Sequence, residues 1–356
     1  MKQRAFKTCM WLCCCGLTLS SLVCYFVYTN HATLTQWKSI LLGEPRNSQF
    51  DLNASRVKSM YKLAGIALRI DNYDWASATD VCSNGIVFPS GIIKSLAGEV
   101  SVFFHDEKER RSTMRHMNKN GTWERRNLNT LSEIMENHNE AYFFDIYAGV
   151  GLYSLPIVKL GRKVAAIEYR YSFAERLCRG IIAGNFQHKA FIVNNFISHA
   201  HQSAPIKLEH LSQRPKVGGD MSGNMFSTVS SVKLNALLDR FSVESVVVRI
   251  DMTPEDIPAV LNADEFFEFG NVLYVLMEWT HISGSLEIPK LLAFMDKYDL
   301  VPCLNIACKK PLTPEQSSTW PAYVLWTRRE LRPKAPAAVK TSPVFRTGNA
   351  AIGAVG

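Results

Sequence analysis

Several short apolar runs between residues 141 and 278 each stop at a polar side chain. These polar positions are Asp145, Glu168, Asn194, Asn195, Asp251 and Glu278. Carboxylates and amides accept hydrogen bonds, and a well-placed carboxylate can take a proton as a general base. In parallel sheets covered by helices, ligands bind beyond the carboxyl ends of the strands. If the runs are strands of one such sheet, the polar positions are predicted to form one site.

The first of these runs continues into a glycine-bearing turn, in the sequence FFDIYAGVG. Gly149 and Gly151 let the backbone approach a ligand closely, and the following helix start offers free N–H groups. The next run, KVAAIE, ends at Glu168, 23 residues after Asp145, which fits one strand–helix–strand step. A carboxylate there can accept both ribose hydroxyls of a nucleotide. A structural turn and a surface acid explain each feature alone, but their register favours a nucleotide cofactor.

The elements that must position these residues alternate from residue 141 onwards. The predicted strands cover 141–146, 163–168, 190–193, 245–250 and 271–277. Nearly continuous apolar strands separated by helices indicate a parallel sheet covered on both faces. Thr253 and Pro254 are predicted to open a helix just after Asp251, as an N-cap and a first-turn proline. Segments 300–306 and 322–327 are predicted to add an antiparallel pair.

The segments outside this pattern carry weaker signals. Residues 100–105 are predicted to form a strand, 106–126 an exposed charged loop and 131–137 a short helix. Residues 199–228 are rich in Ser, Gly and Pro and are interpreted as an insertion. The Pro- and Ala-rich tail, residues 332–356, is predicted to be disordered.

The chain begins with a basic cluster and then an apolar run, residues 9–29, long enough for a helix to cross a membrane. A cleaved signal peptide is the alternative, but its apolar core is usually shorter and a small-x-small cleavage site should follow. Because the basic cluster comes first, residues 1–8 are expected in the cytoplasm. A stem, residues 30–60, and a lumenal domain, residues 61–331, would follow. This order predicts a single-pass type II membrane protein of the Golgi or endoplasmic reticulum.

Sequons and cysteines agree with a secretory location. Asn53 and Asn120 each begin an N-x-S/T glycosylation sequon. Four of the nine cysteines lie in the body of the chain, at Cys82, Cys178, Cys303 and Cys308. In an oxidising compartment a Cys303–Cys308 bridge or a bridge involving Cys82 can form, and the sequence fixes no pairing. No cysteine–histidine spacing typical of zinc occurs, so no metal site is predicted.

The net charge of +8 comes almost entirely from the two ends of the chain. Three basic residues precede the apolar run and four lie in the tail from residue 332, which accounts for seven of the eight charges. A body close to neutrality lacks the net positive charge typical of nucleic-acid binding. Nucleic acid is therefore not the expected partner.

Several motifs together resemble the FkbM-type methyltransferase family, whose domain opens with a pattern close to DIGANVGLYS. This chain has DIYAGVGLYS at 145–154 and KVAAIEYR at 163–170. Where the family shows a helix of LDxLL type, a strand and KIDVEGAE, this chain has LNALLDRFSVESVVVRIDMTPED at 234–256. VLMEW and YVLWTRRE match the closing strands. The resemblance covers about residues 140–330, with its parts in the right order.

The resemblance implies a class I methyltransferase fold, Rossmann-like, with a mostly parallel seven-stranded sheet and S-adenosylmethionine as cofactor. The residues expected around the methionine and ribose are Asp145, Tyr147, Gly149, Gly151 and Glu168. Asn195 and Phe196 are expected near the adenine. Asp251 is expected beside the methyl group, where it could orient or deprotonate an acceptor hydroxyl, and His281 is a candidate second base.

This chain departs from the family at two motifs. Tyr147 replaces the first glycine, so a large side chain is expected near the methionine part of the cofactor, and Gly149 replaces an asparagine. RIDMTP stands where the family has KIDVEG, which removes one acid and one glycine. Asp256 keeps an acid nearby, although it could instead serve the start of the helix.

Three functions are compatible with these features. The first is an O-methyltransferase of the secretory pathway, acting on a hydroxyl of a glycan or another lumenal molecule. The second is a non-catalytic relative with a binding or scaffold role. The third is a type II glycosyltransferase, which shares the anchor, but the D-x-D motif typical of metal-dependent members does not occur.

Overall fold

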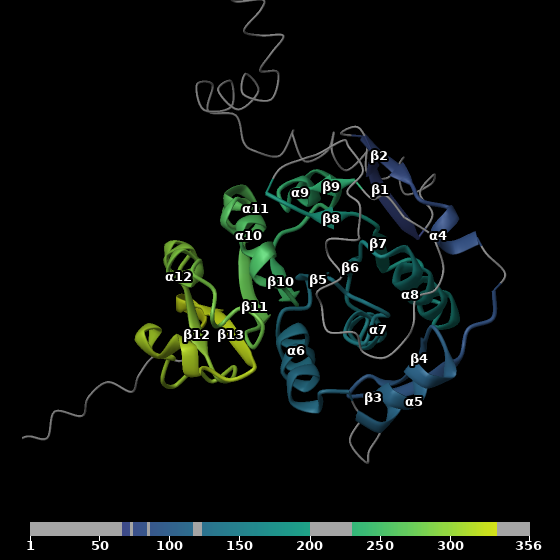
Figure 1. Cartoon of the computed structure of the whole chain (residues 1–356), viewed down its shortest axis with the longest axis horizontal. Coiled ribbons are helices and arrows are strands. Elements are labelled where there is room, and N and C mark those ends of the chain that lie inside the picture. The colour runs from purple at the N-terminus through teal and green to yellow at the C-terminus, as the bar shows by residue number, and fades with distance from the viewer. Residues whose placement is uncertain (1–65, 72–73, 84–85, 117–122, 200–229, 333–356) are drawn as a thin grey trace, which may run out of the picture. The chain divides into compact units, whose positions relative to one another are not determined.

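The computed structural model describes residues 66–71, 74–83, 86–116, 123–199 and 230–332, all within one compact unit (Figure 1). Its centre is a nine-stranded sheet in the order β12-β13-β11-β10-β5-β6-β7-β1-β2. Five central strands are parallel neighbours: β5 (Tyr142–Ile146), β6 (Val164–Ile167), β7 (Ala190–Val193), β10 (Val246–Ile250) and β11 (Val272–Glu278). Their carboxyl ends therefore lie along one edge, as the sequence predicts.

The closing strands give the sheet its particular topology. β13 (Tyr323–Arg328) lies antiparallel between β11 and β12 (Leu300–Cys303). The seven strands from β12 to β7 have the order of a class I methyltransferase, which confirms the predicted fold class. The prediction of seven strands is too small, because β1 (Ala67–Asp71) pairs with β7 and β2 (Asp74–Ser77) pairs with β1.

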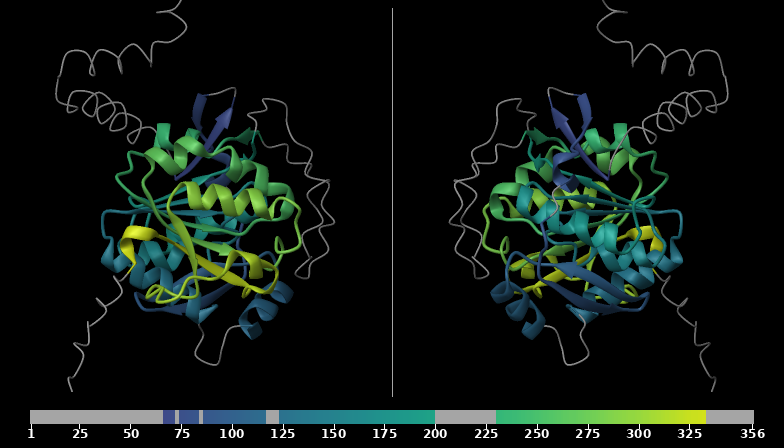
Figure 2. Two further views of the ribbon diagram at one scale, coloured as in Figure 1. Left: turned by 90° about the vertical axis from the view of Figure 1, so that its left-hand side faces the viewer. Right: turned by 90° about the vertical axis from the view of Figure 1, so that its right-hand side faces the viewer.

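Helices cover both faces of the sheet (Figure 2). One face packs against α6 (Arg125–Asn137), α7 (Ser154–Lys159) and α8 (Tyr171–Ala183). The other packs against α9 (Ala236–Arg240), α10 (Ile257–Leu261), α11 (Asp264–Phe269) and α12 (Ile288–Lys297). The two faces share β5, in which Phe144 faces one core and Phe143 the other. Continuous apolar strands are required because both faces are buried.

A separate hairpin, β3 (Ser90–Ser95) with β4 (Gly98–Phe103), packs near α7 and α8. The strand predicted at 100–105 therefore exists but lies outside the main sheet. The loop predicted for 106–126 is wrong in its first half, where α5 (Glu107–His116) forms. Asp106 accepts a hydrogen bond from the Glu109 N–H at 2.6 Å, and this N-terminal cap explains the helix.

Two disulfides involve all four cysteines of the described residues. Cys82, in the short helix α4 (Asp80–Ser83), is bonded to Cys178 of α8. Cys303 is bonded to Cys308 in the loop after β12. Both bridges that the sequence allowed are therefore formed, and the first fastens the segment before the hairpin to the core.

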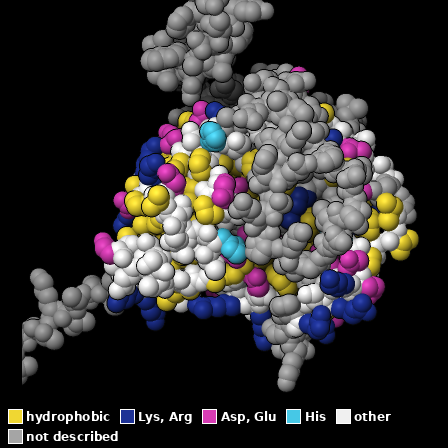
Figure 3. Space-filling model, viewed as in Figure 1, with side chains coloured by type: hydrophobic (Ala, Val, Ile, Leu, Met, Phe, Trp, Pro, Cys, Tyr) yellow, Lys and Arg dark blue, Asp and Glu magenta, His cyan; other side chains and the backbone are white. Residues whose placement is uncertain are grey.

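The predicted membrane run at 9–29, the stem, the insertion from residue 200 and the tail after residue 332 lie outside the described residues. Within the described ranges, no helix has the length and apolar character needed to span a membrane. On the face drawn in Figure 3, Lys and Arg side chains gather along the lower edge.

Candidate functional site

Asp145 and Arg249 form the buried centre of the carboxyl edge. Arg249, the fourth residue of β10, lies with Nη1 3.4 Å from Asp145 Oδ1 and Nη2 3.5 Å from Asp251 Oδ2. Ser154 donates a 2.6 Å hydrogen bond to the other oxygen of Asp145. Burial raises the pKa of Asp145, and the Arg249 charge opposes that shift. Asp145 therefore joins β5, β10 and α7 and has no exposed surface for a ligand.

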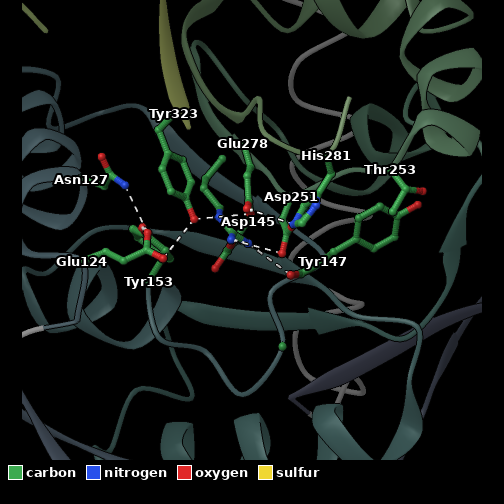
Figure 4. Close-up of polar contacts among 12 residues, drawn as sticks. Glu124, Asn127, Asp145, Tyr147, Tyr153, Asp251, Thr253, Glu278, His281 and Tyr323 are labelled. Carbon is green, nitrogen blue, oxygen red and sulfur yellow. Dashed lines mark hydrogen bonds and ion pairs between the residues drawn. The ribbon is translucent and has the colours of Figure 1, made fainter. Parts of the chain in front are cut away.

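Asp251, Glu278 and His281 come together at the ends of β10 and β11 (Figure 4). His281 Nε2 lies 3.2 Å from Glu278 Oε1. Burial, the charge of Asp251 and a hydrogen bond with Asp251 together raise the pKa of Glu278 to about 7. Two carboxyl groups share a hydrogen bond only when one is protonated, so this pair holds or releases a proton near neutral pH. Asp251 and His281 therefore both interact with Glu278, and their catalytic roles stay predictions.

A second group of residues supports this pair. Glu124, just before α6, accepts hydrogen bonds from the hydroxyls of Tyr153 and Tyr323, the latter at 3.0 Å. The Tyr323 hydroxyl also lies 3.4 Å from Glu278 Oε2. Burial raises the pKa of both phenols, so they remain protonated donors. Glu124 thereby fixes Tyr323 beside Glu278.

Sequence reasoning did not place Glu124, Tyr153, Arg249 or Tyr323 in the site. Arg249 offered a signal, because a cation inside the apolar run SVVVRI needs a buried acid as partner. Tyr323 offered another, because the first residue of an antiparallel strand lies at the carboxyl edge of its parallel neighbours. Glu124 has no periodic or motif signal.

Glu168 follows β6, at the part of the carboxyl edge away from Asp251 and Glu278, where the sequence predicts a nucleoside. Its buried carboxylate accepts hydrogen bonds from the backbone N–H groups of Gly149 and Arg170, both at 2.8 Å. The Arg170 side chain adds Nε, 3.1 Å from Oε1, and Nη2, 3.5 Å from Oε2. A carboxylate has about four lone-pair positions, so these donors fill it. A ribose diol also presents two donors, the same number that the 28% exposed Arg170 side chain contributes.

The two glycines of the turn have different roles. Gly149 and Gly151 have φ values of 58° and 89°, which glycine adopts without strain. A Cβ on Gly149 would meet nothing closer than Phe173, at 3.9 Å, so the backbone there is open. A Cβ on Gly151 would lie 2.4 Å from Leu177. Gly151 is therefore required for the packing of α8, whereas Gly149 is the glycine that a ligand can approach.

Tyr147 adopts a left-handed backbone with φ 63°, in place of the family's glycine. Its hydroxyl donates to Asp256 Oδ1 at 2.9 Å, and its ring stacks on Phe196 with centroids 6.1 Å apart. Asp256 also accepts from the backbone and hydroxyl of Thr253, which completes the cap expected at this helix start. The large side chain is thus directed toward the helix after β10, across the ends of the strands.

Asn195 and Phe196 follow β7 as expected, but their side chains differ in how far a ligand can reach them. The Asn195 side chain is fully buried, where it accepts from the Ile70 N–H and donates to the carbonyls of Ile70 and Ser230. Its place near the adenine stays a prediction, and the structure uses its amide to hold β1 to this edge. Phe196, at the start of β8 (Phe196–Ile197), is partly exposed and packs edge-on against Tyr169 at 5.4 Å. These two rings can border a flat base.

The described residues contain no group of three or more His, Cys, Asp or Glu side chains that could hold a metal ion. The carboxyl edge carries two separate groups of acids, named here for the roles that the sequence predicts: the nucleoside side, around Glu168, and the proton-transfer side, around Asp251 and Glu278.

Solved structures resemble this chain only at low identity and low TM-score. No protein-family model matches the chain, and no curated protein matches it significantly. A SAM-dependent O-methyltransferase from Thermotoga maritima matches 72% of this chain and 83% of its own, with 12% identity and a TM-score of 0.33. A T. thermophilus 16S rRNA methyltransferase, solved with AdoMet and guanosine, matches 68% of this chain and 51% of its own, with 10% identity and a TM-score of 0.34. At these values the fold assignment rests on the strand order, which defines a chain with the class I methyltransferase fold.

Proposed function

We propose that this chain is an S-adenosylmethionine-dependent O-methyltransferase that modifies a neutral hydroxyl group. The observation that carries the proposal is the Asp251–Glu278 pair, whose shared proton titrates near pH 7 at the carboxyl edge of the sheet. Such a pair can accept a hydroxyl proton under physiological conditions. It lies at the strand ends where class I methyltransferase folds bind ligands.

Glu168 would hold the ribose hydroxyls of the cofactor, with Gly149 giving the backbone room for close approach. Tyr169 and Phe196 would border the adenine. The cofactor, when bound, supplies a methyl group on a positively charged sulfur. The Tyr147 side chain lies between the glycine turn and the helix after β10. The cofactor is therefore expected to fit tightly around its methionine part.

Asp251 is the residue that meets the acceptor, because its side chain is about 31% exposed whereas that of Asp145 is fully buried. Asp251 would orient the acceptor hydroxyl and take its proton, while the cofactor, when bound, would supply the methyl group. Glu278, which is hydrogen-bonded to Asp251, lies 3.2 Å from His281 Nε2 and would share the added proton with Asp251. Tyr323, fixed by Glu124, holds Glu278 in place.

We further propose that the reaction takes place in the lumen of the Golgi or endoplasmic reticulum, on a glycan hydroxyl. The support is the pair of disulfides, which persist in oxidising compartments. The apolar run at 9–29 would anchor the chain as a type II membrane protein, with the sequons on the same side as the catalytic domain.

A non-catalytic binding role is the second candidate, and one observation favours it. The Glu168 carboxylate is already saturated by donors of the chain itself, so it has no unmet need for a ligand. If Arg170 never releases Glu168, the fold would persist without the cofactor.

The test is transfer of a radiolabelled methyl group from S-adenosylmethionine to a panel of neutral and anionic glycans. The full chain should label at least one acceptor class, and Asp251→Asn should lose that labelling. Base-stable label on the glycan would identify an ether product. Absence of label with every acceptor, from protein that binds the cofactor, would favour the non-catalytic role.

A further inference from the structure

A basic surface begins beside the proton-transfer side of the edge. It comprises five side chains, named here the basic strip: Arg125, Arg126, Lys309, Lys310 and Arg332. The first four are exposed and Arg332 is partly exposed.

Contacts join these residues although they come from three parts of the chain. Arg126 Nη2 donates to the Leu304 carbonyl at 3.1 Å, which fastens the start of α6 to the loop after β12. That loop is closed by the Cys303–Cys308 disulfide and leads directly to the two lysines. Arg332 Nη2 donates to the Cys308 carbonyl at 3.3 Å. The cations are therefore held together by the fold rather than by chance proximity of loops.

The charge of the basic strip is not neutralised locally. None of its members forms an ion pair with an acidic side chain of the described residues, whereas nearby Arg329 is paired with Asp296 and Asp299. The first turn of α6 carries two arginines and no acid. A body that is nearly neutral overall therefore concentrates positive charge here.

The neighbouring site has the opposite sign. Glu124 directly precedes Arg125 and is linked through Tyr323 to Glu278. Negative groups of a ligand are repelled from Asp251 and Glu278 and attracted to the basic strip. An acceptor that can bind the basic strip and also react at Asp251 has anionic groups along its length and a neutral hydroxyl at the point of reaction.

We infer that the basic strip binds a sulfated or carboxylated glycan chain and that this polyanion presents the acceptor hydroxyl to Asp251. The part of this inference that concerns methyl transfer rests on the proposed function, whereas binding of the glycan to the basic strip does not. A glycan is favoured over nucleic acid because the two disulfides are typical of oxidising compartments, which agrees with the lumenal location that the proposed function gives the domain.

The test measures binding of a fluorescent heparin octasaccharide to the full chain without S-adenosylmethionine. The strip variant carries Arg125→Ser, Arg126→Ser, Lys309→Ser and Lys310→Ser. The matched control removes the same charge from exposed positions elsewhere, with Lys108→Ser, Arg111→Ser, Arg115→Ser and Lys163→Ser. Circular dichroism and the thermal midpoint establish that both variants are folded.

The strip variant should bind at least about tenfold more weakly, as expected for four lost surface charge contacts, and the control should stay within about twofold of the parent. The affinity of the parent should fall steeply with salt. Equal losses in the two variants, or none in either, would overturn the inference. Equal or tighter binding of a charge-matched RNA, or of phosphatidylserine vesicles, through the same four residues would also overturn it. Binding without methyl transfer would instead leave the strip intact and count against the proposed function.

Discussion

The nucleoside side and the proton-transfer side of the carboxyl edge satisfy their carboxylates in different ways. Around Glu168, donors fill the buried carboxylate, and the backbone supplies two of them. Around Asp251 and Glu278, carboxyl groups face each other, and Glu278 titrates near neutral pH. Paired carboxyl groups of this kind exchange protons. The arrangement around Glu168 suits recognition of a diol, and the pair of Asp251 and Glu278 suits proton transfer.

The largest effect should come from breaking the proton-transfer side. Asp251→Asn keeps the size of the side chain but removes the exposed base, so kcat should fall by about 10²- to 10⁴-fold. Cofactor affinity should change little, because Asp251 is not among the donors and acceptors around Glu168. Steady-state kinetics with the labelled acceptor give the first value and cofactor dialysis the second. A matching loss of cofactor affinity would show that the two sides are not separate.

Glu168→Ala should break the nucleoside side instead. Loss of two hydrogen bonds from the ribose to a buried carboxylate, each worth about 1.5 kcal/mol or more, should weaken cofactor binding by roughly a hundredfold. Equilibrium dialysis with labelled S-adenosylmethionine measures the change, and Glu168→Gln serves as a size-matched control with an intermediate loss. Unchanged affinity in both variants would remove Glu168 from the cofactor site.

Arg170→Ala should strengthen binding of the cofactor at the nucleoside side and so sharpen the contrast with the proton-transfer side. The guanidinium competes with the ribose for Glu168, so its removal should tighten cofactor binding by roughly three- to tenfold, the scale of a partly exposed ion pair. The thermal midpoint without cofactor should fall slightly, because Glu168 loses a partner. Weaker binding would mean that Arg170 contacts the cofactor itself.

The smallest effect concerns pH. The rate should rise with pH through about 7, because the Asp251–Glu278 pair accepts a proton best after losing the one it shares. The negative charge of Glu124 raises the pKa of Glu278, so Glu124→Gln should lower the midpoint, by roughly half a pH unit. A pH profile of kcat compares the two proteins. A midpoint that moves upward would contradict the electrostatic role of Glu124.

The sequence predicted the central sheet well because its strands are buried on both faces. Runs such as AYFFDI and SVVVRI are too continuously apolar for a surface element, and each ends at the polar group that faces the site. The insertion of β13 between β11 and β12 is not encoded in any local pattern, although the antiparallel pairing was predicted. The strands at 67–77 were missed because β2 is largely exposed and lacks an apolar repeat.

The site was predicted only where backbone topology decides it. Asp251 and Glu278 meet because β10 and β11 are neighbours, which strand order alone ensures. Asn195 follows a strand in the same way, yet its amide is used by Ile70 and Ser230. The role of Glu124 depends on two tyrosines from distant segments, and no spacing rule identifies such contacts. Side-chain partners across the fold are therefore the part that required the structure.

The most direct test of the central claim is calorimetric titration of S-adenosylmethionine into the folded full chain. S-adenosylmethionine should bind saturably, with an affinity in the micromolar to millimolar range typical of enzyme substrates. The Glu168→Ala variant should lose this binding. No heat of binding from protein that circular dichroism and thermal melting report as folded, at cofactor concentrations of several millimolar, would contradict it. That result would leave a methyltransferase fold in which Arg170 permanently occupies the place of the ribose.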